Sequence, residues 1–137
     1  MASTTLRIAL VQQDTLWQNP AANLARAREF VGQAARAGAR VAVFPELFTL
    51  GFTMAPEPFA EALPGPTSEA IAALSREFNL YIVGSAVEAH VPHPRNAAFV
   101  TAPDGAKRAF SFSNNALAAS AEASVTKNRR PFPYAPR

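Results

Sequence analysis

Short apolar runs alternate with amphipathic stretches along the first 112 residues of the chain. Each apolar run has the length and composition of a strand. Asp104-Gly105, between the last two runs, has the chemistry of a tight hairpin turn. The pattern therefore predicts five strands, which span residues 6–12, 40–44, 80–86, 96–101 and 107–112.

Two helices are predicted between these strands. Asn19-Pro20 is a helix-start signal, with asparagine as the N-cap and proline at the first helical position. Gly38 is placed to end this helix as a C′ glycine. A second helix is expected from near Thr67 to Phe78, after a loop rich in proline and glycine. The stripes that should face the core are Leu24, Ala27, Val31 and Ala34 in the first helix, and Ile71, Leu74 and Phe78 in the second.

The order β-α-β-α-β-β, with continuously apolar strands, predicts an α/β fold whose helices cover at least one face of the sheet. With 137 residues, of which 49% are hydrophobic, the chain can form one domain with a core. After Phe112 the composition changes, because residues 113–126 contain five Ala, three Ser and two Asn without a clear period. We therefore divide the chain into a folded part, residues 1–112, and an atypical tail that we expect to be disordered, residues 113–137.

The whole net charge of +3 lies in the tail, because the basic and acidic side chains of the preceding residues balance. Residues 1–108 hold nine basic and nine acidic side chains, whereas residues 109–137 hold four basic side chains and one acidic residue, Glu122. Nucleic-acid binding would need a basic face on the folded part. We therefore expect no nucleic-acid partner, and the simpler interpretation of Arg129-Arg130 is a solvated tail.

The hydropathy of the chain also bears on membranes and export. No apolar run approaches the roughly 20 residues that span a bilayer, so we expect no membrane segment. The start of the chain lacks a basic region, and Arg7 interrupts its first apolar run, so we expect no signal peptide. A cytoplasmic protein is the default expectation.

Candidate chemistry is limited by the absence of cysteine, which excludes a disulfide, a thiolate metal site and a thiol nucleophile within these 137 residues. The only histidines, His90 and His93, lie in a proline-rich loop, where the simpler interpretation is a solvated pair rather than a metal site. A Ser-His-Asp triad has few candidates here.

Glu46 is the sharpest local candidate. It follows the apolar run Val41-Ala42-Val43-Phe44 and Pro45, so it stands just beyond the carboxyl end of a predicted strand. In open α/β sheets that end of the strands is where ligands bind. Apolar neighbours would desolvate the carboxylate and raise its proton affinity toward the range of a general base. The alternative is that Glu46 only caps a following turn or helix.

Segments spread over residues 6 to 112 together resemble the nitrilase superfamily of carbon–nitrogen hydrolases. The segment 38–48 resembles the family's glutamate motif, and Thr49-Leu50-Gly51-Phe52-Thr53-Met54 resembles the form found in omega-amidase-like members. The remaining matches follow in the family's order: Arg7-Ile8-Ala9-Leu10-Val11-Gln12-Gln13-Asp14, Asn23-Leu24, Gly65-Pro66-Thr67, Ile82-Val83-Gly84-Ser85, and Asn96-Ala97-Ala98-Phe99-Val100 with Pro103-Asp104-Gly105.

This resemblance implies the N-terminal part of a nitrilase-like α-β-β-α sandwich, and a homo-oligomer for the complete protein. It also implies a Glu-Lys-Cys catalytic set that hydrolyses a small amide or nitrile without a metal or organic cofactor. Of these residues only the glutamate carries over, to Glu46. The Gly51-Phe52-Thr53-Met54 segment points to omega-amides of 2-oxo dicarboxylic acids as substrates.

The sequence departs from the family where the lysine should follow the Asp104-Gly105 hairpin, because residues 110–115 contain none. Lys127 is the only later lysine, and it lies too far along the chain unless an insertion intervenes. A reading-frame change near residues 111–113 is a second explanation, since a shifted frame can restore both a lysine and a Glu-x-Tyr segment. It would also explain the unusual composition and charge of the tail.

Two functions therefore remain open. The first is a carbon–nitrogen hydrolase part that, without its nucleophile, should not turn over alone. The second is a non-catalytic module that pairs with a full-length homologue. In both cases an open sheet edge and an uncovered apolar face are expected, and both favour association.

Overall fold

The structure is a computed structural model that describes residues 5–112 of the 137. The predictions that concern the tail, including disorder, the frame change and a role for Lys127, lie outside the described residues. Within residues 5–112 the elements alternate as the hydropathy pattern predicts, although most strands differ by one or two residues at their ends.

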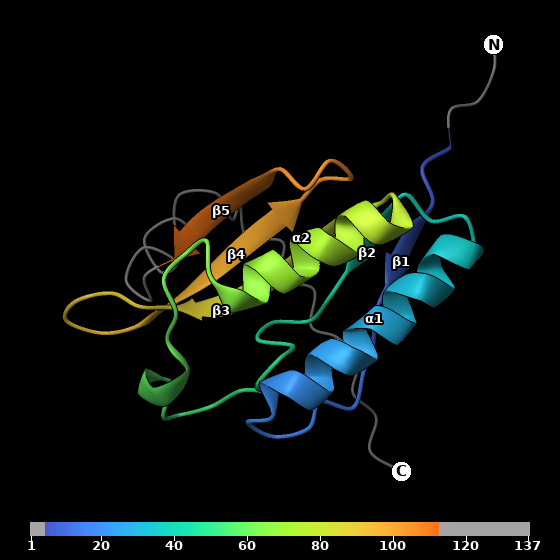
Figure 1. Cartoon of the computed structure of the whole chain (residues 1–137). Coiled ribbons are helices and arrows are strands. Elements are labelled where there is room, and N and C mark those ends of the chain that lie inside the picture. Colours follow the sequence, from blue (N-terminus) through green and yellow to red (C-terminus); the bar gives the residue numbers. More distant parts are fainter. Residues whose placement is uncertain (1–4, 113–137) are drawn as a thin grey trace, which may run out of the picture.

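Five strands form one mixed sheet in the order β1-β2-β3-β4-β5, which Figure 1 shows from the side of the helices. The first three strands are parallel, and β4 and β5 are added antiparallel at one side as successive hairpins. Each pair of successive parallel strands is joined by a crossover connection that contains a helix, as parallel pairing requires. The strands are β1 (Ile8–Leu10), β2 (Val41–Val43), β3 (Tyr81–Glu88), β4 (Arg95–Thr101) and β5 (Lys107–Phe112).

Helix α1 (Pro20–Arg36) begins and ends at the residues that the capping signals predict. The side chain of Asn19 accepts a hydrogen bond of 3.2 Å from the backbone N–H of Ala22. At the other end Gly38 has a φ of +75°, the left-handed conformation that glycine adopts without steric cost. The predicted stripe faces the core, with Ala27, Val31 and Ala34 buried and Leu24 partly buried.

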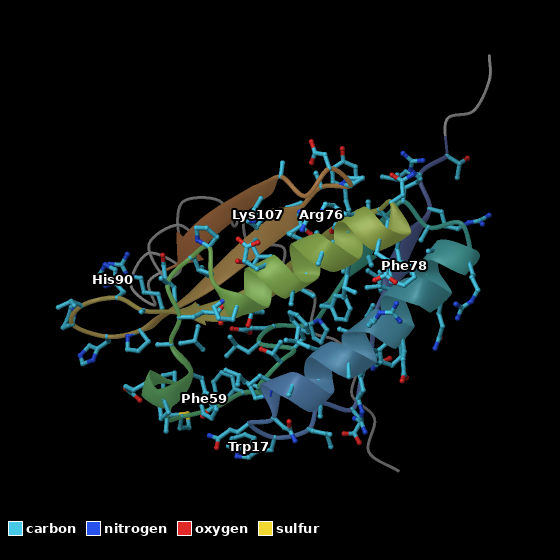
Figure 2. All side chains as sticks on the ribbon, viewed as in Figure 1. Trp17, Phe59, Arg76, Phe78, His90 and Lys107 are labelled. Atoms are coloured by element: carbon cyan, nitrogen blue, oxygen red, sulfur yellow. The ribbon has the colours of Figure 1, made fainter. Side chains whose placement is uncertain are left out.

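Helix α2 (Pro66–Phe78) follows the loop that contains the 3₁₀ turn Glu57–Phe59. Its N-terminus is capped by a residue from that loop, since the carboxylate of Glu61 accepts hydrogen bonds from the backbone N–H and the hydroxyl of Thr67. Ile71 and Leu74 are buried as predicted, and Phe78 packs partly buried against the same core. Figure 2 shows Phe78 where the two helices lie beside each other.

Both helices lie on one face of the sheet, so the described part has one helical layer and one sheet layer (Figure 1). The core lies between them, and its largest fully buried side chains include Phe48, Phe99, Ile71 and Ile82. The opposite face of the sheet carries no described helix. Consequently the first apolar run, although long enough for a buried strand, is not fully buried in β1, where Ile8 is 50% and Leu10 80% exposed.

Candidate active site

Glu46 stands immediately after β2, where the three parallel strands present their carboxyl ends. Two buried aromatic rings flank it in sequence and fix the path of the chain. The rings of Phe44 and Phe48 pack against each other with centroids 4.7 Å apart and 38° between their planes. Because both rings are anchored in the core, the short segment between them is held against the end of the sheet.

The backbone beside Glu46 is fixed by a buried hydrogen bond from β3. Leu47 has a φ of +47°, a left-handed conformation that is unfavourable for a leucine. Its N–H donates to the hydroxyl oxygen of Ser85 at 2.8 Å, inside the protein. Its carbonyl accepts from the N–H groups of Leu50 and Gly51, each at 2.8 Å. These bonds make the turn after β2 a defined structure rather than a free loop.

The turn is also tied to helix α1 through a fully buried side chain, Asn23. Its amide nitrogen donates to the carbonyls of Leu16 and Thr49, at 2.7 and 2.8 Å, and its oxygen accepts from the N–H of Leu16 at 2.9 Å. Gln18 adds a hydrogen bond to Thr53 at 2.9 Å. The segment before α1 and the segment after Glu46 therefore support each other. Figure 2 shows Trp17 at this end of α1.

The side chain of Glu46 has one hydrogen-bond partner among the described residues, and it comes from β4. The amide nitrogen of Asn96 donates to Oε1 of Glu46 at 2.6 Å. The carboxylate therefore accepts from a side chain, and not from a backbone N–H of the following turn, which disfavours a capping role for Glu46. The amide oxygen of Asn96 is buried, and no described residue donates to it.

Two hollows adjoin the carboxylate. The first, called the Glu46 cavity below, has a volume of about 270 Å³ and is lined by Glu46, Leu47, Phe52, Thr53, Met54, Pro56, Val87, Pro94, Arg95 and Asn96. The second has a volume of about 330 Å³ and lies over the open face of the sheet at Val83, Ser85 and Ala98. Glu46 and Asn96 line both, so the candidate base stands where the two meet.

The setting of Glu46 corrects one expectation. Its side chain is exposed, whereas the apolar context predicted a desolvated carboxylate. The physical reason is that its apolar neighbours in sequence, Phe44 and Leu47, are turned inward into the two cores, so they do not cover the carboxylate. No described element covers the open face of the sheet beside it.

The other chemical candidates do not join this site. His90 lies in the loop between β3 and β4, at the far end of the molecule in Figure 2, and His93 lies in the same loop. Within residues 5–112, no group of three or more His, Cys, Asp or Glu side chains is placed to hold a metal ion. Nor do the helices of this part include one that is long and apolar enough to cross a membrane.

Three residues of the site were not recognised in the sequence as site residues: Ser85, Arg95 and Asn96. Ser85 and Asn96 belong to segments that match the family, but their contacts depend on strand register. The register pairs Val87 with Asn96 and Ser85 with Ala98, which places Ser85 and Asn96 on the same face as Glu46. The one signal available in the sequence was the polar residue Asn96, which lies at the start of an otherwise apolar strand.

The chain belongs to the carbon–nitrogen hydrolase family, whose sequence profile matches residues 7–129. This match, together with the relatives and the solved structure described next, confirms the resemblance to the nitrilase superfamily and to its omega-amidase-like members. The match also extends beyond Phe112, into the tail.

Similar proteins agree with this assignment. Omega-amidase NIT2 of Mus musculus is 31% identical over 105 residues, and Nitrilase 3 of Arabidopsis thaliana is 29% identical over 109 residues. These alignments cover 74% and 63% of this chain but 37% and 31% of the relatives. The solved structure of XC1258 from Xanthomonas campestris, a CN-hydrolase superfamily protein with an arsenic adduct in its active site, is 30% identical. It superimposes with a TM-score of 0.71 over 80% of this chain and 41% of that one.

The chain thus spans little more than a third of the length of the omega-amidases it matches. Its fold is the corresponding part of the nitrilase fold, as the sequence predicts.

Proposed function

We propose that Glu46 is the general base of a carbon–nitrogen hydrolase site that cleaves small amides. The observation that carries this proposal is the position of its carboxylate, which borders two cavities while Asn96 holds one of its oxygens. The held oxygen, Oε1, orients the group, and Oε2 has no partner among the described residues. A base that is fixed at one oxygen and free at the other is well arranged to take a proton.

The family's Glu-Lys-Cys chemistry gives Glu46 a defined part. Oε2 would take the proton of the thiol, the thiolate would attack the amide carbonyl, and a lysine would stabilise the negative oxygen of the tetrahedral intermediate. Collapse of that intermediate breaks the C–N bond while Glu46 returns its proton to the leaving nitrogen, which departs as ammonia. Water, deprotonated by Glu46, then hydrolyses the acyl-enzyme and frees the thiol. None of these steps needs a metal or an organic cofactor.

This chain contains no cysteine, so the thiol is absent from its 137 residues. Loss of the nucleophile from a coupled catalytic set removes orders of magnitude in rate. We therefore expect the purified chain to release no ammonia from 2-oxoglutaramate or 2-oxosuccinamate above background. Turnover that disappears in Glu46→Ala would show that the chain is active without a thiol, and would contradict this part of the proposal.

We further propose that the substrates of the complete protein are omega-amides of 2-oxo dicarboxylic acids. The support is the Gly51-Phe52-Thr53-Met54 segment and the similarity to omega-amidases. Phe52 and Met54 line the Glu46 cavity, so this segment is in a position to contact a substrate. A homo-oligomer and a cytoplasmic location for the complete protein stay predictions.

A second candidate function is a non-catalytic module that pairs with a full-length homologue. The observation that favours it is the open face of the sheet, where Ile8, Leu10 and Tyr81 expose 50%, 80% and 43% of their surface. Exposed apolar surface of this kind favours association. Co-elution of the chain with a full-length omega-amidase homologue, lost in Leu10→Glu, would support this function. Separate elution at micromolar concentrations would exclude it.

A further inference from the structure

We propose that Arg95 forms a carboxylate-binding subsite in the Glu46 cavity, so that this cavity selects small amides that carry a terminal carboxylate. This inference rests on the proposed function, because it assigns the group that would recognise the acyl part of the substrate. Arg95 is the first residue of β4 and adjoins Asn96, the partner of Glu46. Both Arg95 and Asn96 line the Glu46 cavity.

The Glu46 cavity is lined by one residue of each charge. Of the described residues that line it, Glu46 alone is anionic and Arg95 alone is cationic, and most of the others are apolar. An amide with a terminal carboxylate would be repelled by Glu46 if no cation stood near the other end of the ligand. Arg95 supplies that cation, and its planar guanidinium can bind a carboxylate through two parallel hydrogen bonds.

Arg95 is also without a partner in the described structure. Elsewhere Lys107 pairs with Glu69 at 2.8 Å, and Arg28 pairs with Glu77, but no described side chain forms an ion pair or a hydrogen bond with Arg95. Glu88 stands opposite Arg95 in the β3–β4 ladder, and it has an interaction of its own. Arg95 is partly buried, and a partly buried cation without a partner favours an anionic ligand.

Arg95 and Glu46 line the same cavity but do not form an ion pair with each other. Each charged group is therefore available to a ligand. A cavity of about 270 Å³ suits a ligand of metabolite size rather than a larger molecule. Such a ligand could place its amide at Glu46 and its carboxylate at Arg95.

The experiment compares two ligands that differ only in this carboxylate, succinamate and its neutral diamide, succinamide. Each is titrated into the ¹⁵N-labelled 137-residue chain, and dissociation constants are taken from the backbone shifts of Leu47, Val87 and Asn96. Three variants are measured beside the unmodified chain. Arg95→Gln removes the cation, Arg95→Lys keeps the charge without the planar group, and Arg40→Gln removes an exposed arginine at the opposite end of β2.

We expect the unmodified chain and Arg40→Gln to bind succinamate about tenfold or more tighter than succinamide, as a charge-assisted pair would provide. Arg95→Gln should bind the two ligands equally, and Arg95→Lys should keep part of the preference. Equal binding by the unmodified chain, absence of binding, or equal losses in Arg95→Gln and Arg40→Gln would each overturn the subsite.

A fourth variant separates this inference from the proposed function. Glu46→Gln should retain the preference for succinamate, since it removes a repulsive charge and leaves Arg95 in place. If Glu46 proves not to be a base, the preference that depends on Arg95 would still be measurable. A preference that disappears in Glu46→Gln but persists in Arg95→Gln would assign carboxylate recognition elsewhere and overturn the subsite.

Discussion

Asn96 and Glu46 are 50 positions apart in the chain, and the amide nitrogen of the first donates to the carboxylate of the second at 2.6 Å. An ionised carboxylate can only accept, so this contact determines which way the amide of Asn96 is turned. The hydrogen bond joins β4 to the turn after β2, across the end of the intervening strand β3. It therefore fixes the candidate base relative to the sheet rather than relative to its own loop.

The Asn96–Glu46 hydrogen bond can be tested without turnover. In Glu46→Ala the amide of Asn96 loses its acceptor, so one of its two side-chain proton signals should move upfield in a ¹⁵N–¹H spectrum. Since Glu46 is exposed, we expect the free energy of unfolding to change by less than about 1 kcal/mol. Glu29→Ala, which removes an exposed carboxylate from α1, serves as the control. An Asn96 spectrum that is the same in both variants would contradict the contact.

Ser85 should be the main support of the turn after β2. Ser85→Ala leaves the buried N–H of Leu47 without an acceptor, which should lower the free energy of unfolding by about 1–3 kcal/mol. The matched control is Ser75→Ala, which removes another buried serine hydroxyl, one that pairs with Thr101. Both variants should be less stable in urea unfolding, but only Ser85→Ala should speed hydrogen exchange at Leu47 under native conditions. Equal protection of Leu47 in the two variants would exclude this role.

Asn23 should matter more for stability than the other asparagine at the start of α1. Asn23→Ala removes three hydrogen bonds from a fully buried side chain and leaves groups of Leu16 and Thr49 unpaired. We expect a loss of about 2–4 kcal/mol in the free energy of unfolding. Asn19→Ala, which removes the exposed N-cap, should cost about 1 kcal/mol. Comparable losses in the two variants would show that Asn23 does not hold these segments together.

Glu61 should make stability depend on pH. Burial raises the pKa of the Glu61 carboxyl above its ordinary value of 4.5, and hydrogen bonds from Thr67 and Ser68 offset part of that rise. The folded state therefore binds the carboxyl proton of Glu61 more tightly than the unfolded state does. The stabilisation that this proton gives to the folded state is fully present below pH 4.5, and it is lost as pH rises through the pKa of the folded state. Glu61→Gln should remove this loss of stability from urea-unfolding curves measured across that range. The exposed Glu57→Gln should keep it, and identical pH profiles for the two variants would contradict the assignment.

The elements of the folded part could be predicted because their signals are local. Asn19 and Gly38 mark the ends of α1, and Asp104-Gly105 marks the hairpin before β5. The residues around Glu46 could not be assigned from local signals, because the contacts of Ser85 and Asn96 depend on the register of β3 with β4. An uncovered apolar face was expected, but Ile8 and Leu10 could not be assigned to it for a similar reason. An apolar run indicates a strand, but it does not indicate what covers each face of it.

If Glu46 marks the amide-binding site of this chain, a bound amide should lie beside it, and NMR mapping of that amide is the decisive measurement. The ¹⁵N-labelled chain is titrated with 2-oxosuccinamate, and the shifted backbone signals are placed on the structure. We expect shifts concentrated at Leu47, Thr53, Val87 and Asn96, which are described residues that line the Glu46 cavity, and no release of ammonia. Shifts concentrated instead at Gly32, Gln33 and Phe78, in the hollow between the two helices, or the absence of any shift, would contradict it.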